Sequence, residues 1–138
     1  MRRLGPLLLF LLGVALGEGF GPEAALKECL LLIRGLQVLG LYQEEGATLV
    51  LLGQERPLLL VAVERGRPMP HLGPLRGKPM ARRPLPLVKE LSLARQVVAL
   101  PGEYRCFVLH RGRVVGVLRL GQDLRPIPLD LPPETLPQ

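Results

Sequence analysis

The sequence contains no asparagine and no tryptophan, a single serine (Ser92), and only 4% aromatic residues. With so few rings, the core of the fold has to be built from aliphatic side chains, chiefly leucine and valine. The lone serine lies outside any G-x-S-x-G motif, which argues against a serine hydrolase. Lysine is scarce too, because fifteen of the eighteen basic residues are arginine. The lack of thermolabile asparagine is compatible with a thermophile.

Motifs of several enzyme classes are missing as well. Neither phosphate-cradling glycine pattern, GxxxxGK[ST] or GxGxxG, occurs in the chain. The adjacent carboxylates of Glu44 and Glu45 precede Gly46 and are typical of a polar turn. In a strand, Cys106 and His110 would lie about 13 Å apart, which is too far for a nucleophile and its base. We therefore expect a protein that is not an enzyme and needs no cofactor.

The N-terminus has the order of a secretory signal. Two arginines precede an apolar run over residues 7–16, and the small residues Ala15 and Gly17 provide a cleavage motif. The run is shorter than the about 20 residues that cross a bilayer. Residues 1–19 are therefore interpreted as a signal peptide or N-terminal anchor, and the expected location is periplasmic or secreted. Membrane association is expected only if the segment stays uncleaved. A buried core helix of a cytosolic domain is the alternative.

Residues 20–128 are long enough for a single domain with its own core, and residues 129–138 are expected to form an extended, proline-rich tail. The chain has two cysteines, Cys29 and Cys106, without CxxC spacing. In an exported protein, an even pair of distant cysteines predicts a disulfide.

Hydrophobic spacing predicts a helix followed by β-structure. Pro22 suits the first helical turn and Gly40 suits the end. One buried stripe is predicted from the apolar residues at helical spacing, which are Leu26, Cys29, Leu30, Ile33 and Leu36. Two short apolar runs, Thr48–Leu52 and Leu58–Val63, predict strands joined by a turn, with both faces covered.

The C-terminal half predicts a brief helix over residues 87–95, then a strand that ends before Pro101, then a hairpin over residues 103–120. With Arg111 and Gly112 as a two-residue turn, Val108 pairs with Val115 and Cys106 pairs with Val117. The hairpin face that carries Cys106 would receive the N-terminal helix. The predicted class is therefore α+β: an N-terminal helix packed on an antiparallel β-sheet, with a long Pro/Arg-rich loop between strands.

The loop between the strands nearly repeats itself, as RGRPM and then RGKPM. Removing residues 1–17 would lower the formal charge from +6 to +4, because Arg2 and Arg3 go with them. Residues 65–83 hold most of this excess and no acid; the predicted anion-binding residues are Arg65, Arg67, Arg76, Lys78, Arg82 and Arg83. No aromatic residue is available here to stack on bases, so a nucleic-acid partner is not expected. A soluble spacer that discourages aggregation of the flanking strands is the plainer interpretation.

Two functions follow as expectations. The first is an exported, non-enzymatic domain that acts by contact with an unknown protein or an anionic envelope component, with residues 65–83 as the contact surface. The alternative is a periplasmic copper carrier, because Met69, His71 and Met80 are soft-metal ligand types, with Cys106 or His110 as additions. A cytosolic domain of unknown function remains the third possibility.

Overall fold

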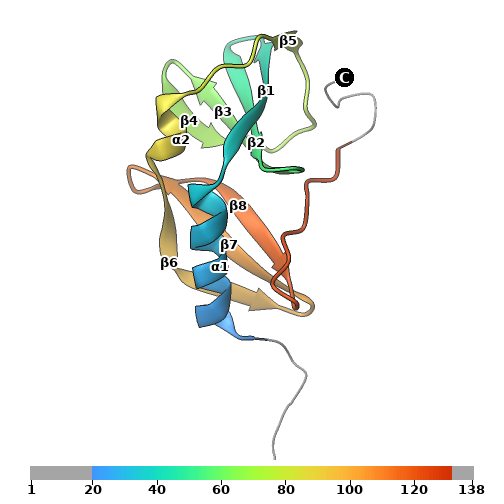
Figure 1. The fold of residues 1–138 in the computed structure, drawn as a ribbon. Coiled ribbons are helices and arrows are strands. Elements are labelled where there is room, and N and C mark those ends of the chain that lie inside the picture. Colours follow the sequence, from blue (N-terminus) through green and yellow to red (C-terminus); the bar gives the residue numbers. More distant parts are fainter. Residues whose placement is uncertain (1–19, 132–138) are drawn as a thin grey trace, which may run out of the picture.

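The computed structural model describes residues 20–131, so the segment interpreted as a signal or anchor and the end of the predicted tail lie outside the described residues. Within them the chain forms two antiparallel sheets, with strand orders β4-β3-β2-β1-β5 and β6-β7-β8. The predicted class, α+β with an N-terminal helix packed on antiparallel β-structure, is confirmed (Figure 1). In chain order the elements are α1 (Pro22–Arg34), β1 (Gln37–Glu44), β2 (Ala47–Gly53), β3 (Pro57–Glu64), β4 (Arg67–Pro70), β5 (Lys78–Met80), α2 (Pro86–Lys89), β6 (Leu91–Leu100), β7 (Glu103–His110) and β8 (Arg113–Gly121).

The hydrophobic core has two parts. The larger part lies where α1 packs on β6 and β7 and where β3 contacts β8, so it joins the helix to both sheets. The smaller part covers the other face of the five-stranded sheet and consists of Tyr42, Leu49, Leu51, Ala62 and Leu75, with Leu129 and Leu131 packed against it. As the composition predicts, leucine and valine fill most of both. Burial on both faces explains why β2 reads as a continuous apolar run.

The helix is shorter than predicted, because it ends at Arg34, with Gly35 as its C-cap, and the chain enters β1 at Gln37. Leu36 continues the helical period, but pairing with β2 from Gln37 onward places the following residues in a sheet. The buried stripe is also rotated from the predicted one and consists of Ala25, Cys29 and Leu32. Leu30, expected in the core, is 38% exposed. Tertiary pairing therefore overrides a helical pattern that the segment alone would allow.

The long Pro/Arg-rich loop is not confirmed, because part of it forms sheet. β4 pairs with β3 and β5 pairs with β1, so the segment borders both edges of the five-stranded sheet. The prolines Pro68, Pro70 and Pro79 lie in these edge strands. An edge strand leaves one side of its backbone unpaired, which is why proline is tolerated there.

The C-terminal half departs from the prediction in two places. The helix predicted over residues 87–95 is only the single turn α2, and β6 begins at Leu91. The turn at Arg111 and Gly112 is confirmed, with positive φ angles of 50° and 81°. A β-bulge then shifts the register by one residue, so that Val108 pairs with Gly116 and Cys106 with Leu118 instead of the predicted valines.

Candidate functional site

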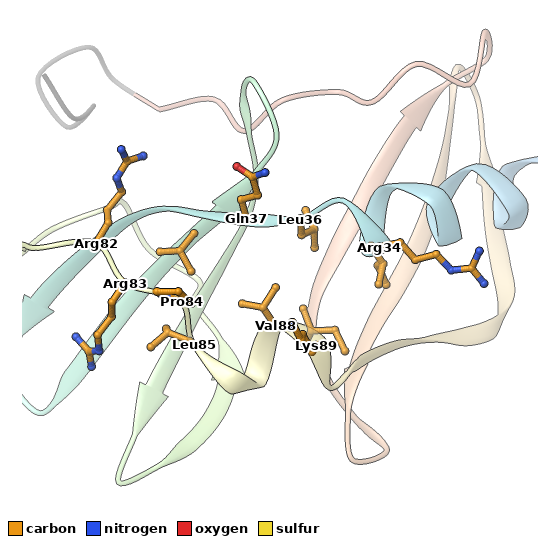
Figure 2. Close-up of a pocket in the computed structure, with 12 residues that line it drawn as sticks. Arg34, Leu36, Gln37, Arg82, Arg83, Pro84, Leu85, Val88 and Lys89 are labelled. Atoms are coloured by element: carbon orange, nitrogen blue, oxygen red, sulfur yellow. The ribbon is translucent and has the colours of Figure 1, made fainter.

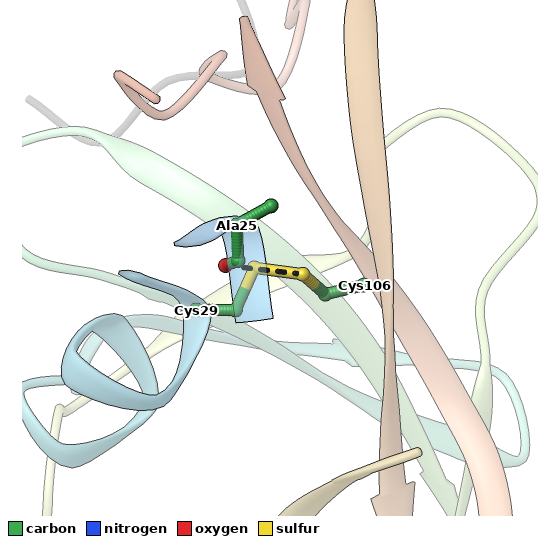
Figure 3. The surroundings of a disulfide bond; sticks show 3 residues. All are labelled: Ala25, Cys29 and Cys106. Atoms are coloured by element: carbon green, nitrogen blue, oxygen red, sulfur yellow. Dashed lines mark hydrogen bonds between the residues drawn. A yellow bond between two sulfur atoms is a disulfide. The ribbon is translucent and has the colours of Figure 1, made fainter. Parts of the chain in front are cut away.

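A disulfide joins α1 to β7, as the sequence predicts. The Cys29 and Cys106 sulfur atoms are 2.13 Å apart and both residues are fully buried (Figure 3). The carbonyl oxygen of Ala25 lies 3.8 Å from the Cys106 sulfur; a disulfide sulfur carries no proton, so this is a packing contact. A hydrogen bond also connects the residue before α1 to β7, because the N–H of Gly21 donates to the Tyr104 hydroxyl at 2.9 Å. No free cysteine remains among residues 20–131, so Cys106 offers no thiolate to a metal.

The six basic residues predicted to bind anions all have exposed side chains. Along the chain they lie in the β3–β4 turn, in β4, in the connection between β4 and β5 (residues 71–77), in β5 and in the chain before α2. Within the described part of the chain, no ion pair involves Arg65, Arg67, Arg76, Lys78, Arg82 or Arg83. Their charges are therefore available to an external anion.

One leucine fixes the middle of this segment to the body of the protein. Leu75 is only 2% exposed and belongs to the smaller core cluster. Two residues later, Gly77 has φ 109°, and a Cβ there would meet the Gln43 carbonyl oxygen at 2.5 Å. The backbone of the segment is thus held against the sheet, which fixes the points along the surface from which the cationic side chains extend.

The predicted soft-metal ligands do not come together. Met69 lies in β4 and Met80 in β5, at opposite edges of the five-stranded sheet. Four strand spacings separate these edges, which is about 19 Å. The two side chains also pack against different core clusters, and the His71 Nε2 atom lies 3.0 Å from the Pro74 carbonyl oxygen. In residues 20–131 no cluster of three or more His, Cys, Asp or Glu forms a metal site either.

A groove of ≈ 620 Å³ lies where the two sheets meet, between the end of α1, the start of β1 and the chain around α2. In Figure 2, Leu36 and Val88 point toward its middle from opposite sides. Its apolar lining consists of Ile33, Leu36, Val38, Pro84, Leu85, Val88 and Leu91. The sequence did not predict this groove, because its walls come from two stretches far apart in the chain, residues 33–38 and 82–91. Among its lining residues, only Arg82 and Arg83 were predicted to bind a ligand.

Positive charge surrounds the groove. Arg34, Arg82, Arg83 and Lys89 line it together with Gln37, and no acidic residue does. None of these four cations forms an ion pair within residues 20–131. Arg82 donates from Nη1 to the Leu39 carbonyl oxygen at 3.4 Å, which is a long hydrogen bond. The groove therefore combines an apolar interior with an uncompensated positive rim.

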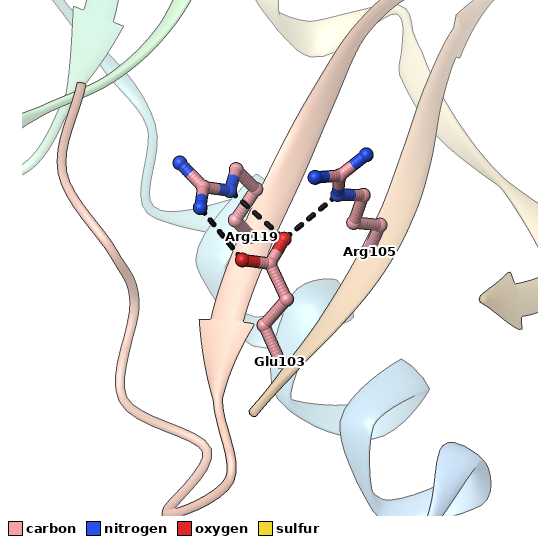
Figure 4. Close-up of polar contacts among 3 residues, drawn as sticks. All are labelled: Glu103, Arg105 and Arg119. Atoms are coloured by element: carbon pink, nitrogen blue, oxygen red, sulfur yellow. Dashed lines mark hydrogen bonds and ion pairs between the residues drawn. The ribbon is translucent and has the colours of Figure 1, made fainter. Parts of the chain in front are cut away.

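Three groups of acidic and basic side chains lie elsewhere on the described chain, one of which is the exposed Arg125–Asp123 pair at 3.8 Å. Glu103 accepts hydrogen bonds from Arg119, at 2.6 and 3.0 Å, and from Arg105, at 2.7 Å (Figure 4). The hydrogen bonds from Arg119 and then Arg105 lower the pKa of Glu103 to about 2. His110 lies 2.8 Å from the Glu90 carboxylate and connects the end of β7 to the residue that follows α2. The contacts of Glu103 and His110 each join neighbouring segments, from β7 to β8 and from β7 to the end of α2.

Comparison of the chain with protein-family models, with curated proteins and with solved structures finds no match. Among the described helices, none has the length and apolar character needed to cross a membrane. Within residues 20–131, the groove and the cationic segment are the candidate functional features.

Proposed function

We propose that this protein is an exported, non-enzymatic domain that acts by contact with a protein or an anionic component of the cell envelope. The contact surface is the cationic segment 65–83. The observation that carries the proposal is that all six basic side chains of the segment are exposed and free of carboxylate partners within the described residues. Clustered charge of one sign attracts an oppositely charged surface over several ångströms in low salt.

The arrangement of the segment supports a surface role. Strands β4 and β5 hold the two ends of the segment at the sheet edges, and Leu75 holds the connection between these strands (residues 71–77). An ordered segment loses less conformational entropy on binding than a free loop would. Arginine side chains also suit carboxylate and phosphate oxygens, because the guanidinium donates two parallel hydrogen bonds. The segment contains no aromatic side chain, so the same geometry favours a polyanionic surface over stacked bases.

The disulfide supports the compartment. Disulfides persist in oxidising environments such as the periplasm and the extracellular space, and are rare in the cytosol. Together with the signal-like order of residues 1–19, the Cys29–Cys106 bond favours export. No observation favours the copper carrier in the same way, because Met69 and Met80 lie at opposite sheet edges.

The test compares two variants of equal charge. In the first, the six basic residues of the segment are replaced by glutamine. In the matched control, six exposed basic residues outside it are replaced: Lys27, Arg56, Arg95, Arg111, Arg113 and Arg125. Each variant has six fewer positive charges than the +6 chain, so both have a formal charge of zero. Retention on polyglutamate and on phosphatidylglycerol vesicles is measured across a salt series.

The wild type and the control variant are expected to bind both probes at low salt and to release them as salt rises. The segment variant is expected to lose retention on at least one probe. Equal retention of the two variants on both probes would remove segment 65–83 from the function.

A further inference from the structure

We propose that the groove beside α2 binds a single-chain amphiphile with a carboxylate headgroup, of the fatty-acid class. This inference rests on the proposed function and deepens it, because Arg82 and Arg83 belong to both the cationic segment and the groove. The apolar interior would hold the acyl chain, and the positive rim would hold the headgroup.

The size and lining of the groove fit this ligand. Its volume of ≈ 620 Å³ lies within the about 300–1,000 Å³ of small-molecule sites, which are mostly apolar with few polar groups. A single acyl chain suits this space, whereas a diacyl lipid with its headgroup is larger. Several of the lining side chains, including Val88 and Leu85, remain partly accessible. Covering them with an acyl chain would contribute about 25 cal/mol per Å² of apolar surface removed from water.

The positive charges around the groove favour an anionic headgroup. Four cations line the groove and no acid does, so a neutral amphiphile would leave the rim uncompensated. The nearest acid in sequence is Glu90, beside Lys89, and its carboxylate is engaged by His110 at 2.8 Å. Cationic residues thus flank the groove on both walls, Arg34 on α1 and Arg82 and Arg83 on the chain before α2.

The cations have to turn inward for this contact. In Figure 2 the guanidinium groups of Arg34, Arg82 and Arg83 point away from the middle of the groove, so mainly their apolar stems lie near it. Exposed side chains change rotamer within nanoseconds, and a charge-assisted hydrogen bond rewards the turn. Binding therefore needs a change of side-chain rotamers on the rim and no movement of the backbone.

Isothermal titration of the full chain with laurate, kept below its critical micelle concentration, tests the proposal. One laurate is expected to bind per chain. Dodecanol, which has the chain without the charge, and propionate, which has the charge without the chain, are expected to bind at least about tenfold more weakly.

Three variants place the ligand in the groove. R82Q/R83Q/K89Q removes rim charges and is expected to weaken laurate binding by about tenfold or more. R65Q/R67Q/R76Q removes three charges of the same segment away from the groove, and is expected to change binding by less than about twofold. V88E, which places a carboxylate on the apolar wall, is expected to abolish binding; its circular dichroism spectrum and thermal unfolding show that it is folded.

The inference is overturned if laurate shows no saturable binding. It is also overturned if the two triple variants weaken laurate binding equally. A dimer that elutes without laurate and dissociates in V88E would also overturn it, because a second copy would then cover the groove. If laurate does not bind while retention on polyglutamate or anionic vesicles still depends on segment 65–83, the proposed function stands and the groove inference falls. If laurate binds but retention does not depend on segment 65–83, the groove inference stands and the proposed function falls.

Discussion

At the scale of single residues, a charge is either paired with an opposite charge or left without a partner on the surface. Glu103 illustrates the first case, because Arg105 and Arg119 surround its carboxylate and leave its side chain only 14% exposed. The six cations of segment 65–83 illustrate the second, since none has a carboxylate partner within residues 20–131. This contrast within one chain distinguishes a structural ion cluster from a surface available to partners.

The Glu103 cluster predicts a specific dependence of stability on pH. The folded-state pKa of about 2 lies below the ordinary 4.5, so the stabilisation is complete above pH 4.5 and is lost as pH falls toward 2. E103Q is therefore expected to have a lower Tm than the wild type at pH 7, and the difference is expected to shrink to nearly nothing at pH 2. E55Q, at an exposed acid without an ion pair among the described residues, is expected to change Tm little. A constant E103Q difference across this range would contradict the prediction.

At the scale of elements, the sequence predicts what depends on local chemistry and fails where pairing decides. The strands β2 and β3 and the turn at Arg111 and Gly112 are confirmed, because apolar runs and turn residues are local signals. The first residues of β1, up to Gly40, were predicted as helix, since the apolar spacing before them continues a helical period. The bulge that shifts Cys106 opposite Leu118 has no local signal that could have predicted it.

The candidate site follows the same division. The exposure of the six cations was predictable, because they lie within residues 65–83 with no acid among them and no core could bury them unpaired. The strands β4 and β5 of this segment were not predictable, because proline is rarely found in interior strands. Only the sheet topology shows that both are edge strands, where proline is tolerated. The groove was not predictable either, because Ile33, Leu85 and Leu91 meet only in the folded chain.

Segment 65–83 is predicted to be held by Leu75. L75A is expected to lower the free energy of unfolding by about 2–5 kcal/mol, the cost of removing a buried leucine from a core. L72A is the matched control: Leu72 lies three residues away, is 96% exposed, and is expected to change stability by less than about 0.5 kcal/mol. Denaturant unfolding measures both. Similar values for the two variants would show that the segment is not packed as described.

At the scale of the whole molecule, the disulfide ties the N-terminal helix to the C-terminal sheet. The bond links residues 77 positions apart, so it restricts most of the described chain when the protein unfolds. The five-stranded sheet is formed between these two points in sequence and packs on β8 through β3 and β4. A disulfide of this span is compatible with an oxidising compartment, where the bond would persist and stabilise the assembled domain.

Loss of this bond is predicted to be costly. The double substitution C29A/C106A is expected to lower the free energy of unfolding by about 3–5 kcal/mol. The wild type in reducing agent is expected to lose a similar amount, whereas the variant is expected to be insensitive to the reductant. A wild type whose stability does not change on reduction would contradict a disulfide that links α1 to β7.

The most direct measurement is a map of the contact surface by NMR. The ¹⁵N-labelled wild type is titrated with polyglutamate and with nanodiscs of phosphatidylglycerol, and the amide shifts are followed residue by residue. The largest changes are expected in residues 65–83, with smaller changes in β6–β8, and reversal at high salt. Changes centred on β6–β8, with residues 65–83 unaffected, would contradict the claim that the cationic segment is the face that this protein presents to its partners.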